Sequence, residues 1–209
     1  ARLAGRPSGE LVEILDEANR ARVVAEVPGA SGRLRFAHAL IRETLYEDLP
    51  PTARMELHLR VGLASESVYR DDLGPHLAAM AHHFAQAAPL GDVDPAIDYA
   101  LRAADRASAV FAYEDAARLL ERALPLLPTG TDNRRRRAEL LMRLGDAKTR
   151  VGDTLGGRDC YEQVAALGRE MADPFLLAEA ALAHETIATP ARLGLGALIV
   201  TSIFGSGTR

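Results

Sequence analysis

The chain contains 209 residues, of which 48% are hydrophobic and 26% are charged, a balance typical of one large or two small globular domains. A net charge of −4 argues against a dedicated binder of nucleic acid or of anionic membranes. The single cysteine, Cys160, excludes an internal disulfide framework and a cysteine-rich zinc site, so we interpret it as a packing residue. Abundant Ala and Leu and few aromatic residues favour a mainly α fold.

The first part of the chain predicts a helix followed by a short two-stranded ribbon. Residues 9–26 carry apolar side chains at three- and four-residue steps, as an amphipathic helix does. The run 23–27 then switches to β-branched residues, and residues 28–32 form a dense turn signal. Residues 33–36 alternate polar and apolar, which predicts the second strand.

Two more helices are expected after the ribbon. The first covers residues 37–48 and ends at a Pro-Pro pair, and the second runs from Thr52, a plausible N-cap, to about Tyr69. Helices flanking a short ribbon are typical of a winged-helix-like module, which we assign to residues 1–72. An α-rich subdomain without a wing is the alternative.

The next segment predicts helices of the size found in helical repeats. One helix is expected over residues 75–88, and the next starts with Asp94 as its N-cap. A further helix runs from Tyr113 to Pro128. The helix that starts at Asp94 is expected to bury one face formed by Ile97, Leu101, Ala104, Ala107 and Phe111.

The spacing of small and large residues partly matches the tetratricopeptide pattern. The second-helix positions of one unit are filled by Ala116, Leu120, Ala123 and Pro128. A second unit aligns through Leu141, Gly145, Lys148, Gly157, Tyr161 and Val164. Ala116 and Gly157 are 41 residues apart, longer than the usual repeat of about 34 residues, and the loop 129–137 explains the excess. A third unit is expected to start at Asp173, followed by Pro174 in the first turn.

These matches predict tetratricopeptide-like helical hairpins, an α-solenoid, over residues 73–189. A non-repetitive helical bundle with the same apolar periodicity is the alternative. Residues 190–209 form an undetermined tail, for which truncation or a shifted reading frame is one explanation. Its apolar stretch, residues 193–204, is too short for a helix that spans a bilayer.

Three segments resemble a family of large bacterial regulators. Residues 35–49, RFAHALIRETLYEDL, resemble a signature of the signal-transduction ATPases with numerous domains, the STAND class. This class includes large LuxR-type transcriptional activators and ATPases fused to adenylate cyclase domains. Residues 77–84 and 96–116 resemble the same family. The resemblance covers roughly residues 8–185 and is most specific over residues 35–49.

In that family a P-loop ATPase module precedes a winged helix and an array of tetratricopeptide-like helices, and an output domain lies elsewhere. The resemblance implies that this chain holds the winged helix and the start of the array. It has no G-x-x-x-x-G-K-[ST] loop, and the glycines of residues 194–196 and 205–207 lack the spacing and the lysine. The chain starts at Ala1, without Met or a signal segment. We therefore expect a non-catalytic, cytoplasmic piece of a larger protein that meets ATP or ADP through the missing ATPase module.

His38 is the sharpest candidate for a functional residue. In related switch ATPases, a winged-helix histidine in a Met-His-Asp-like motif contacts the phosphates of bound ADP, and Phe36-Ala37-His38 resembles that position. Ala39 stands where the motif has Asp. A histidine at a helix start could donate a hydrogen bond to the β-phosphate, and Arg42, one turn later, could contact phosphate as well. The alternatives are that His38 caps the helix and that Arg42 pairs with an acidic neighbour such as Glu43.

Two other polar clusters predict no site. His82 and His83 point about 100° apart on a helix, so they do not converge on one metal ion. His76 and His83 could share a helical face, but no carboxylate or cysteine at the right spacing completes a metal site. Residues 134–137 are four arginines that could contact phosphates. The acidic residues on both sides of this run favour a solvated first turn of a helix instead.

The sequence therefore favours a regulatory role. We expect the winged helix to sense the nucleotide state of the ATPase module, and the array to bind an inducer or a partner protein on its concave face. Binding would shift the population between closed ADP and open ATP states, with transcription as the output and DNA contacted only by a separate domain. No membrane contact is expected. The alternatives are a stand-alone tetratricopeptide adaptor and a DNA-binding winged-helix protein. An enzyme is the weakest interpretation, because no nucleophile–base pair, metal cluster or phosphate loop is visible.

Overall fold

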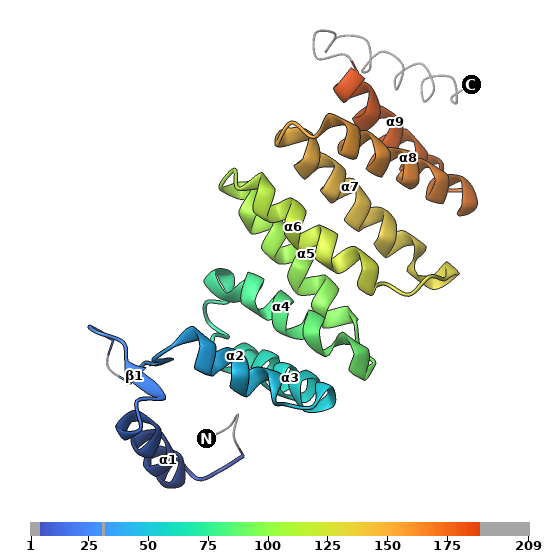
Figure 1. The fold of residues 1–209 in the computed structure, drawn as a ribbon. Helices are drawn as coiled ribbons and strands as arrows, with labels where there is room; N and C mark the ends of the chain where they lie inside the picture. Colours follow the sequence, from blue (N-terminus) through green and yellow to red (C-terminus); the bar gives the residue numbers. More distant parts are fainter. Residues whose placement is uncertain (1–4, 31, 189–209) are drawn as a thin grey trace, which may run out of the picture. The chain divides into compact units, whose positions relative to one another are not determined.

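The computed structural model describes residues 5–30 and 32–188, which form helices and one short antiparallel ribbon (Figure 1). The predicted mainly α fold with a small β-ribbon is confirmed. The tail predicted over residues 190–209 lies outside the described residues. None of the helices in the described ranges is long and apolar enough to cross a membrane.

Contacts divide the chain into two compact units. The first unit contains residues 1–73 and 86–92, and the second contains residues 74–85 and the chain from residue 93 onward. Each unit has its own pattern of burial.

The first unit is built from three helices and the ribbon, in the predicted order. Its elements are α1 (Ser8–Arg20), β1 (Val24–Glu26), β2 (Leu34–Phe36), α2 (Ala39–Glu47), α3 (Pro51–Val68) and the 3-10 turn η2 (Ala88–Leu90). The two strands pair antiparallel, with Ala25 opposite Arg35. The ribbon contacts α1 and α2, and η2 contacts α3.

Two helix ends in this unit differ from the prediction. The helix expected over residues 9–26 ends early because a Schellman motif closes it. The N–H groups of Arg22 and Val23 donate to carbonyls of the last helical turn, and Arg22 takes a left-handed φ of 58°. Thr52 is not the N-cap of α3, because the helix already starts at Pro51. Proline fits a first turn since no carbonyl there needs its missing N–H.

The first unit buries few side chains. Neither α1 nor α2 contains a buried residue, and in α3 only His58 and Gly62 are buried. Leu40 is 72% exposed, and Leu63 is also exposed. A two-stranded ribbon is marginal in water by itself, so the elements of this unit are held by few contacts.

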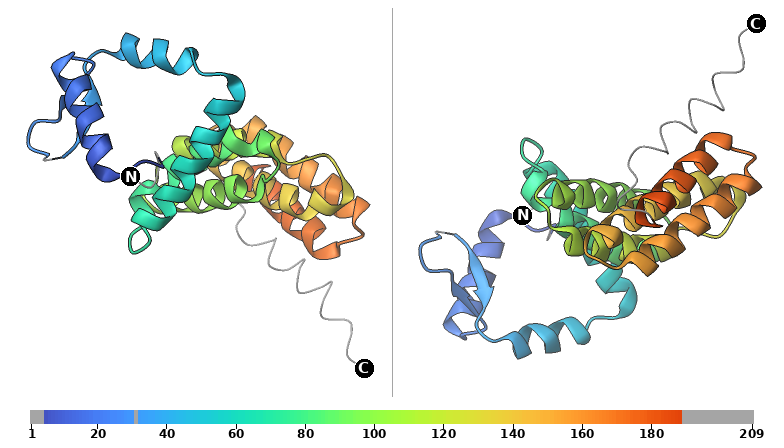
Figure 2. Two further views of the ribbon diagram at one scale, coloured as in Figure 1. Left: turned by 90° about the horizontal axis from the view of Figure 1, so that it is seen from below. Right: turned by 90° about the horizontal axis from the view of Figure 1, so that it is seen from above.

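The second unit is a stack of helices in which each helix from α5 to α9 packs on the next (Figures 1 and 2). Its helices are α4 (Leu77–Ala87), α5 (Asp94–Ala109), α6 (Tyr113–Ala123), α7 (Arg134–Arg150), α8 (Thr154–Glu170) and α9 (Pro174–Ala188). The 3-10 turns are η1 (Gly74–His76), η3 (Leu124–Leu126) and η4 (Thr131–Asn133). The last two residues of α4 belong to the first unit. The rings of Phe84 and Tyr99 stack with centroids 5.4 Å apart, which joins α4 to α5.

The core of the second unit contains Ile97, Leu120, Leu141 and Val164, which were predicted on the helical face of residues 94–111 or at repeat positions. The largest fully buried side chains are Met80, Ile97, Leu120, Leu140, Leu141 and Val164. Phe111 is a correction, because it was expected on the buried face of α5 and is 78% exposed. The helix ends at Ala109, and a Schellman motif gives Phe111 a φ of 61° that turns its side chain out of the helical face.

The hairpins α5–α6 and α7–α8 match each other with an offset of 41 residues. The pair Ala104 and Leu120 in the first hairpin corresponds to Gly145 and Tyr161 in the second. A Cβ on Gly145 would lie 2.6 Å from Cε1 of Tyr161, so the tyrosine fits only because its neighbour has no side chain. In the second hairpin the small and the large position therefore lie in direct contact, and the matching residues of the first hairpin, Ala104 and Leu120, are both buried.

The starts of the other helices follow local capping rules. Asp153 caps α8, because its Oδ1 accepts the Gly156 N–H at 2.9 Å. The predicted start of α9 is confirmed: Oδ1 of Asp173 accepts the N–H groups of Phe175 and Leu176, both at 3.1 Å. Asp94 is not the N-cap of α5 but its first helical residue, where its charge still favours the helix dipole.

Candidate functional site

His38 stands directly after the ribbon, at the N-cap position of α2. Its backbone is extended, with φ of −134° and ψ of 138°, and its side chain makes no capping hydrogen bond. The side chain is exposed. The His38 carbonyl accepts the Arg42 N–H at 3.4 Å, so the two predicted site residues share the first turn of α2. This turn offers unpaired helix N–H groups and a favourable dipole to an anion.

Arg42 contacts an acidic neighbour at the surface. Its Nη2 lies 3.6 Å from Oε1 of Glu43, and both side chains are more than half exposed. Such an exposed pair contributes little stability, so a phosphate could replace the carboxylate at small cost. His38 and Arg42 thus lie one turn apart on an exposed part of the chain.

A polar contact that sequence reasoning missed joins α2 to α3. Oη of Tyr46 and Nε2 of His58 are 2.9 Å apart, and the two rings meet edge to face. The guanidinium of Arg54 lies 5.4 Å from the centroid of the Tyr46 ring, within cation–π range. Tyr46 belongs to the signature-like segment 35–49, and its part here is to hold α2 on α3. The contact crosses a Pro-Pro corner, so no helical periodicity could have indicated it.

The histidines and the cysteine form no reactive cluster in the part of the chain that the structure describes. No group of three or more His, Cys, Asp or Glu side chains there could hold a metal ion. The rings of His82 and His83 meet edge to face with centroids 5.5 Å apart. Burial raises the pKa of the Cys160 thiol to about 11, which keeps it protonated and a weak nucleophile at neutral pH.

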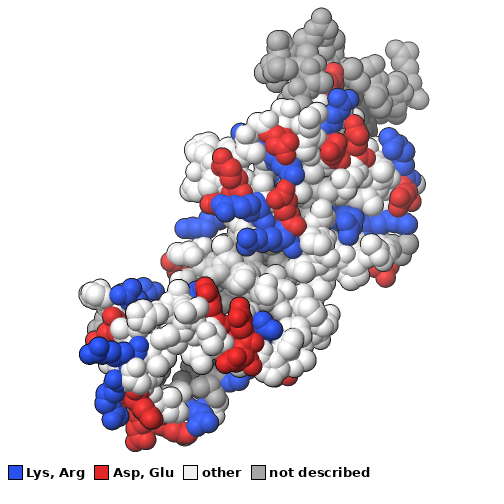
Figure 3. All heavy atoms as spheres, viewed as in Figure 1, with Lys and Arg blue, Asp and Glu red and all other residues white. Residues whose placement is uncertain are grey.

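The arginine run forms the first turn of α7, as predicted, and its partly exposed side chains also contact other helices. Arg134, Arg135 and Arg136 form ion pairs with Glu170, with Asp173, and with both Asp94 and Asp98. The guanidinium of Arg137 donates to the carbonyl of Leu127 at 3.2 Å. These partners come from α5, α8 and the cap of α9. Acidic and basic side chains accordingly lie side by side on this unit (Figure 3).

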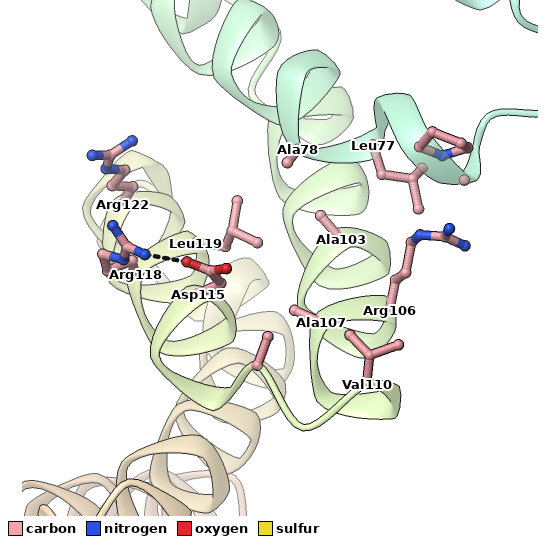
Figure 4. Close-up of a pocket in the computed structure, with 13 residues that line it drawn as sticks. Leu77, Ala78, Ala103, Arg106, Ala107, Val110, Asp115, Arg118, Leu119 and Arg122 are labelled. Carbon is pink, nitrogen blue, oxygen red and sulfur yellow. Dashed lines mark hydrogen bonds and ion pairs between the residues drawn. The ribbon is translucent and has the colours of Figure 1, made fainter.

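A groove of about 430 Å³ opens among η1, α4, α5 and α6 (Figure 4). Ala103 and Ala107 of α5 form part of its lining, and Leu119 of α6 adds an apolar wall. Its charged lining consists of Arg106, Asp115, Arg118 and Arg122. We call it the arginine groove. Sequence reasoning missed it because its residues come from separate helices and no two arginines are adjacent.

The charges of the arginine groove are not balanced inside it. Arg118 pairs with Asp115 one turn earlier on α6. Arg106 and Arg122 form no ion pair with another described residue. Arg106 lies on α5 and Arg122 on α6, so unpaired guanidinium groups stand on two of the helices that line the groove (Figure 4).

Two other hollows of this unit contain paired charges. One of about 250 Å³ lies among α5, α6 and α7, and one of about 690 Å³ lies between α7 and α9. Arg143, which lines both, donates to Asp105 and to Glu139. Arg150 donates to Oη of Tyr113 at 3.2 Å and lies over its ring. These arginines already have partners, unlike the two unpaired ones of the arginine groove.

Comparison of the chain with family models, with curated proteins and with solved structures finds no match in any of the three. The resemblance to STAND-class regulators therefore stays a prediction from the sequence.

Proposed function

We propose that the chain is a non-catalytic regulatory segment of a cytoplasmic STAND-class ATPase and transcriptional regulator. Its first unit acts as the winged helix that senses nucleotide state, and its second unit acts as the array that binds an inducer or a partner protein. The observation that carries the proposal is the position of His38 and Arg42. Within the signature-like segment 35–49, both lie on the exposed first turn of α2.

The chemistry of this turn suits a phosphate of ADP. A neutral or protonated imidazole donates a hydrogen bond, a guanidinium contributes positive charge, and the helix N-terminus attracts an anion. The turn contacts a ligand from one side, so the ATPase module of the parent protein must supply the rest of the nucleotide site. Loss of the contact on exchange of ADP for ATP would release the winged helix.

The helical stack supplies the sensing surface of the proposal. A stack in which each helix contacts mainly its neighbours exposes long faces and grooves, on which inducers or partners bind. A ligand that fits one arrangement of the array better than the other shifts the equilibrium between ADP and ATP states. DNA would be contacted by a separate output domain.

The test uses the complete protein encoded by the gene. We expect His38→Ala to lower the amount of ADP that stays bound through purification by about tenfold, the effect of losing one charge-assisted hydrogen bond. Basal transcriptional output should rise. The matched control is Glu47→Ala, an exposed residue on the last turn of the same helix. ADP retention equal to that of the wild type in the His38→Ala protein contradicts the proposal.

The neighbouring coding sequence separates this proposal from the main alternative. A P-loop encoded directly upstream in the same reading frame supports the ATPase assignment. A start codon at that position, with no P-loop, supports a stand-alone tetratricopeptide adaptor instead.

A further inference from the structure

The two matched hairpins of the second unit carry different residues at one equivalent position, Lys148 in the second hairpin and Ala107 in the first. Lys148 of α7 has its Nζ 2.8 Å from Oε1 of Glu121 and 3.6 Å from Oδ2 of Asp153. The residue 41 positions earlier is Ala107, in the lining of the arginine groove. In the second hairpin, therefore, a lysine fills the position and is neutralised. In the first hairpin an alanine leaves it open.

The arginines of the groove are not required by the repeat itself. The matching positions in the second hairpin hold an alanine, an aspartate and a glutamine, which are Ala147, Asp159 and Gln163. Both hairpins nevertheless bury their matched small and large residues, Ala104 and Leu120 in the first and Gly145 and Tyr161 in the second. The three guanidinium groups are thus a feature that the first hairpin adds to a shared scaffold.

The turn between α5 and α6 carries a second unusual feature. Phe111 has a φ of 61°, a left-handed conformation that bulky residues rarely adopt, and the matching residue of the second hairpin is Gly152. Phe111 is 78% exposed, and Val110, which lines the arginine groove, is 68% exposed. Within the chain the Phe111 ring meets that of Tyr113 edge to face but adds nothing to the core. Because it directly follows Val110 of the groove lining, this exposed aromatic residue points to a contact outside the chain.

We propose that the arginine groove binds an acidic peptide segment of a partner protein. Carboxylates of the peptide pair with Arg106 and Arg122, and an apolar side chain packs on Ala107. Val110 and Phe111 form an apolar rim that covers the end of the peptide. The inference deepens the proposed role of the array and rests on that part of it only. It does not depend on His38.

Charge and shape favour this occupant over two others. A planar guanidinium pairs with a carboxylate through two parallel hydrogen bonds, which a groove with unpaired arginines is suited to accept. A nucleic acid has no aliphatic side chain to pack on Ala107 and Leu119 in the lining of the groove. A small anion would leave Val110 and Phe111 uncovered, whereas peptides and proteins bury such apolar rims.

The experiment measures binding of a short fluorescent peptide, built of Asp, Glu, Leu and Phe, to the full chain by fluorescence anisotropy. We expect the wild type to bind this peptide and not its Asn/Gln counterpart. Arg106→Gln and Arg122→Gln should each weaken binding by about tenfold, and Ala107→Leu should weaken it as much by filling the groove without changing charge. Asp115→Asn should tighten binding several-fold, because it removes the one competing carboxylate of the groove.

The matched control is Arg169→Gln, which removes an exposed arginine of α8 outside the groove. Circular dichroism verifies that each variant folds. Equal weakening by the control and the groove variants contradicts the proposal, since it indicates attraction by net charge alone. Absence of binding to the acidic peptide, full competition by inorganic phosphate, or preference for a DNA duplex also contradicts it. None of these results bears on ADP retention, so the two proposals fail separately.

Discussion

The two units contain helices of similar amphipathic pattern and differ in what those helices bury. In the first unit the apolar stripe of α1 stays at the surface, and Leu15 is 41% exposed. In the second unit the stripe of α6 is covered by the neighbouring helices, and Leu120 is 1% exposed. Periodicity therefore predicts that a helix forms, while burial depends on whether another helix faces the stripe.

The largest expected contrast between the units comes from shortening matched leucines. Leu120→Ala removes a fully packed side chain and should lower the free energy of unfolding of the second unit by about 3 kcal/mol. Leu15→Ala should cost less than about 1 kcal/mol, because the side chain already contacts water. Urea denaturation combined with segment-resolved hydrogen exchange reads each unit separately. Equal losses for the two variants would remove the distinction between the units.

Replacing one glycine in each unit by alanine should change the stability of the two units in opposite directions. Gly145→Ala places a methyl group against the ring of Tyr161 and should destabilise the second unit by about 2 kcal/mol. Gly9→Ala meets no atom within 4 Å on α1 and should stabilise that helix by up to about 1 kcal/mol. Thermal unfolding and exchange rates of the two segments test the signs. A neutral Gly145→Ala variant would show that the tyrosine ring moves aside freely.

The smallest effect concerns two of the three helix ends in the described residues that use a left-handed residue other than glycine, the third being Ala172 after α8. Phe111→Gly should raise the stability of the second unit by about 0.5–1 kcal/mol, because glycine adopts a positive φ without strain. Arg22→Gly should slow hydrogen exchange only near the end of α1, since few contacts couple that helix to its unit. A Phe111→Gly variant that is less stable would show that the exposed ring contributes to folding.

Much of the second unit could be predicted because apolar spacing and helix-capping residues are local features of the sequence, and because a neighbouring helix covers each predicted apolar face. Leu120 and Val164 recur at helical spacing, and Asp173 has the side chain and following proline of a helix start. Phe111 was wrongly predicted to be buried because its apolar side chain continues the spacing of the buried face of α5. The sequence at this position does not indicate that the helix has already ended. Glycine at a helix end predicts a left-handed backbone conformation, whereas an aromatic residue does not.

The two candidate sites also differ in whether the sequence alone could reveal them. His38 and Arg42 could be found because they lie in one short segment that resembles a known signature. The arginine groove could not, since Arg106 and Arg122 come to line one pocket only when α4, α5 and α6 pack together. The ion pairs of the run 134–137 were also hidden, because their acidic partners lie in α5, α8 and the loop before α9.

The same arginine run makes the contacts between helices of the second unit sensitive to salt. Four consecutive residues at one end of α7 connect the preceding hairpin, the following helix of the same hairpin and the cap of α9. These contacts are mostly ionic and partly exposed, so dissolved salt weakens them while it leaves the apolar core intact. A rise in salt concentration should therefore weaken the junctions between these helices before it affects the core that each pair of helices shares.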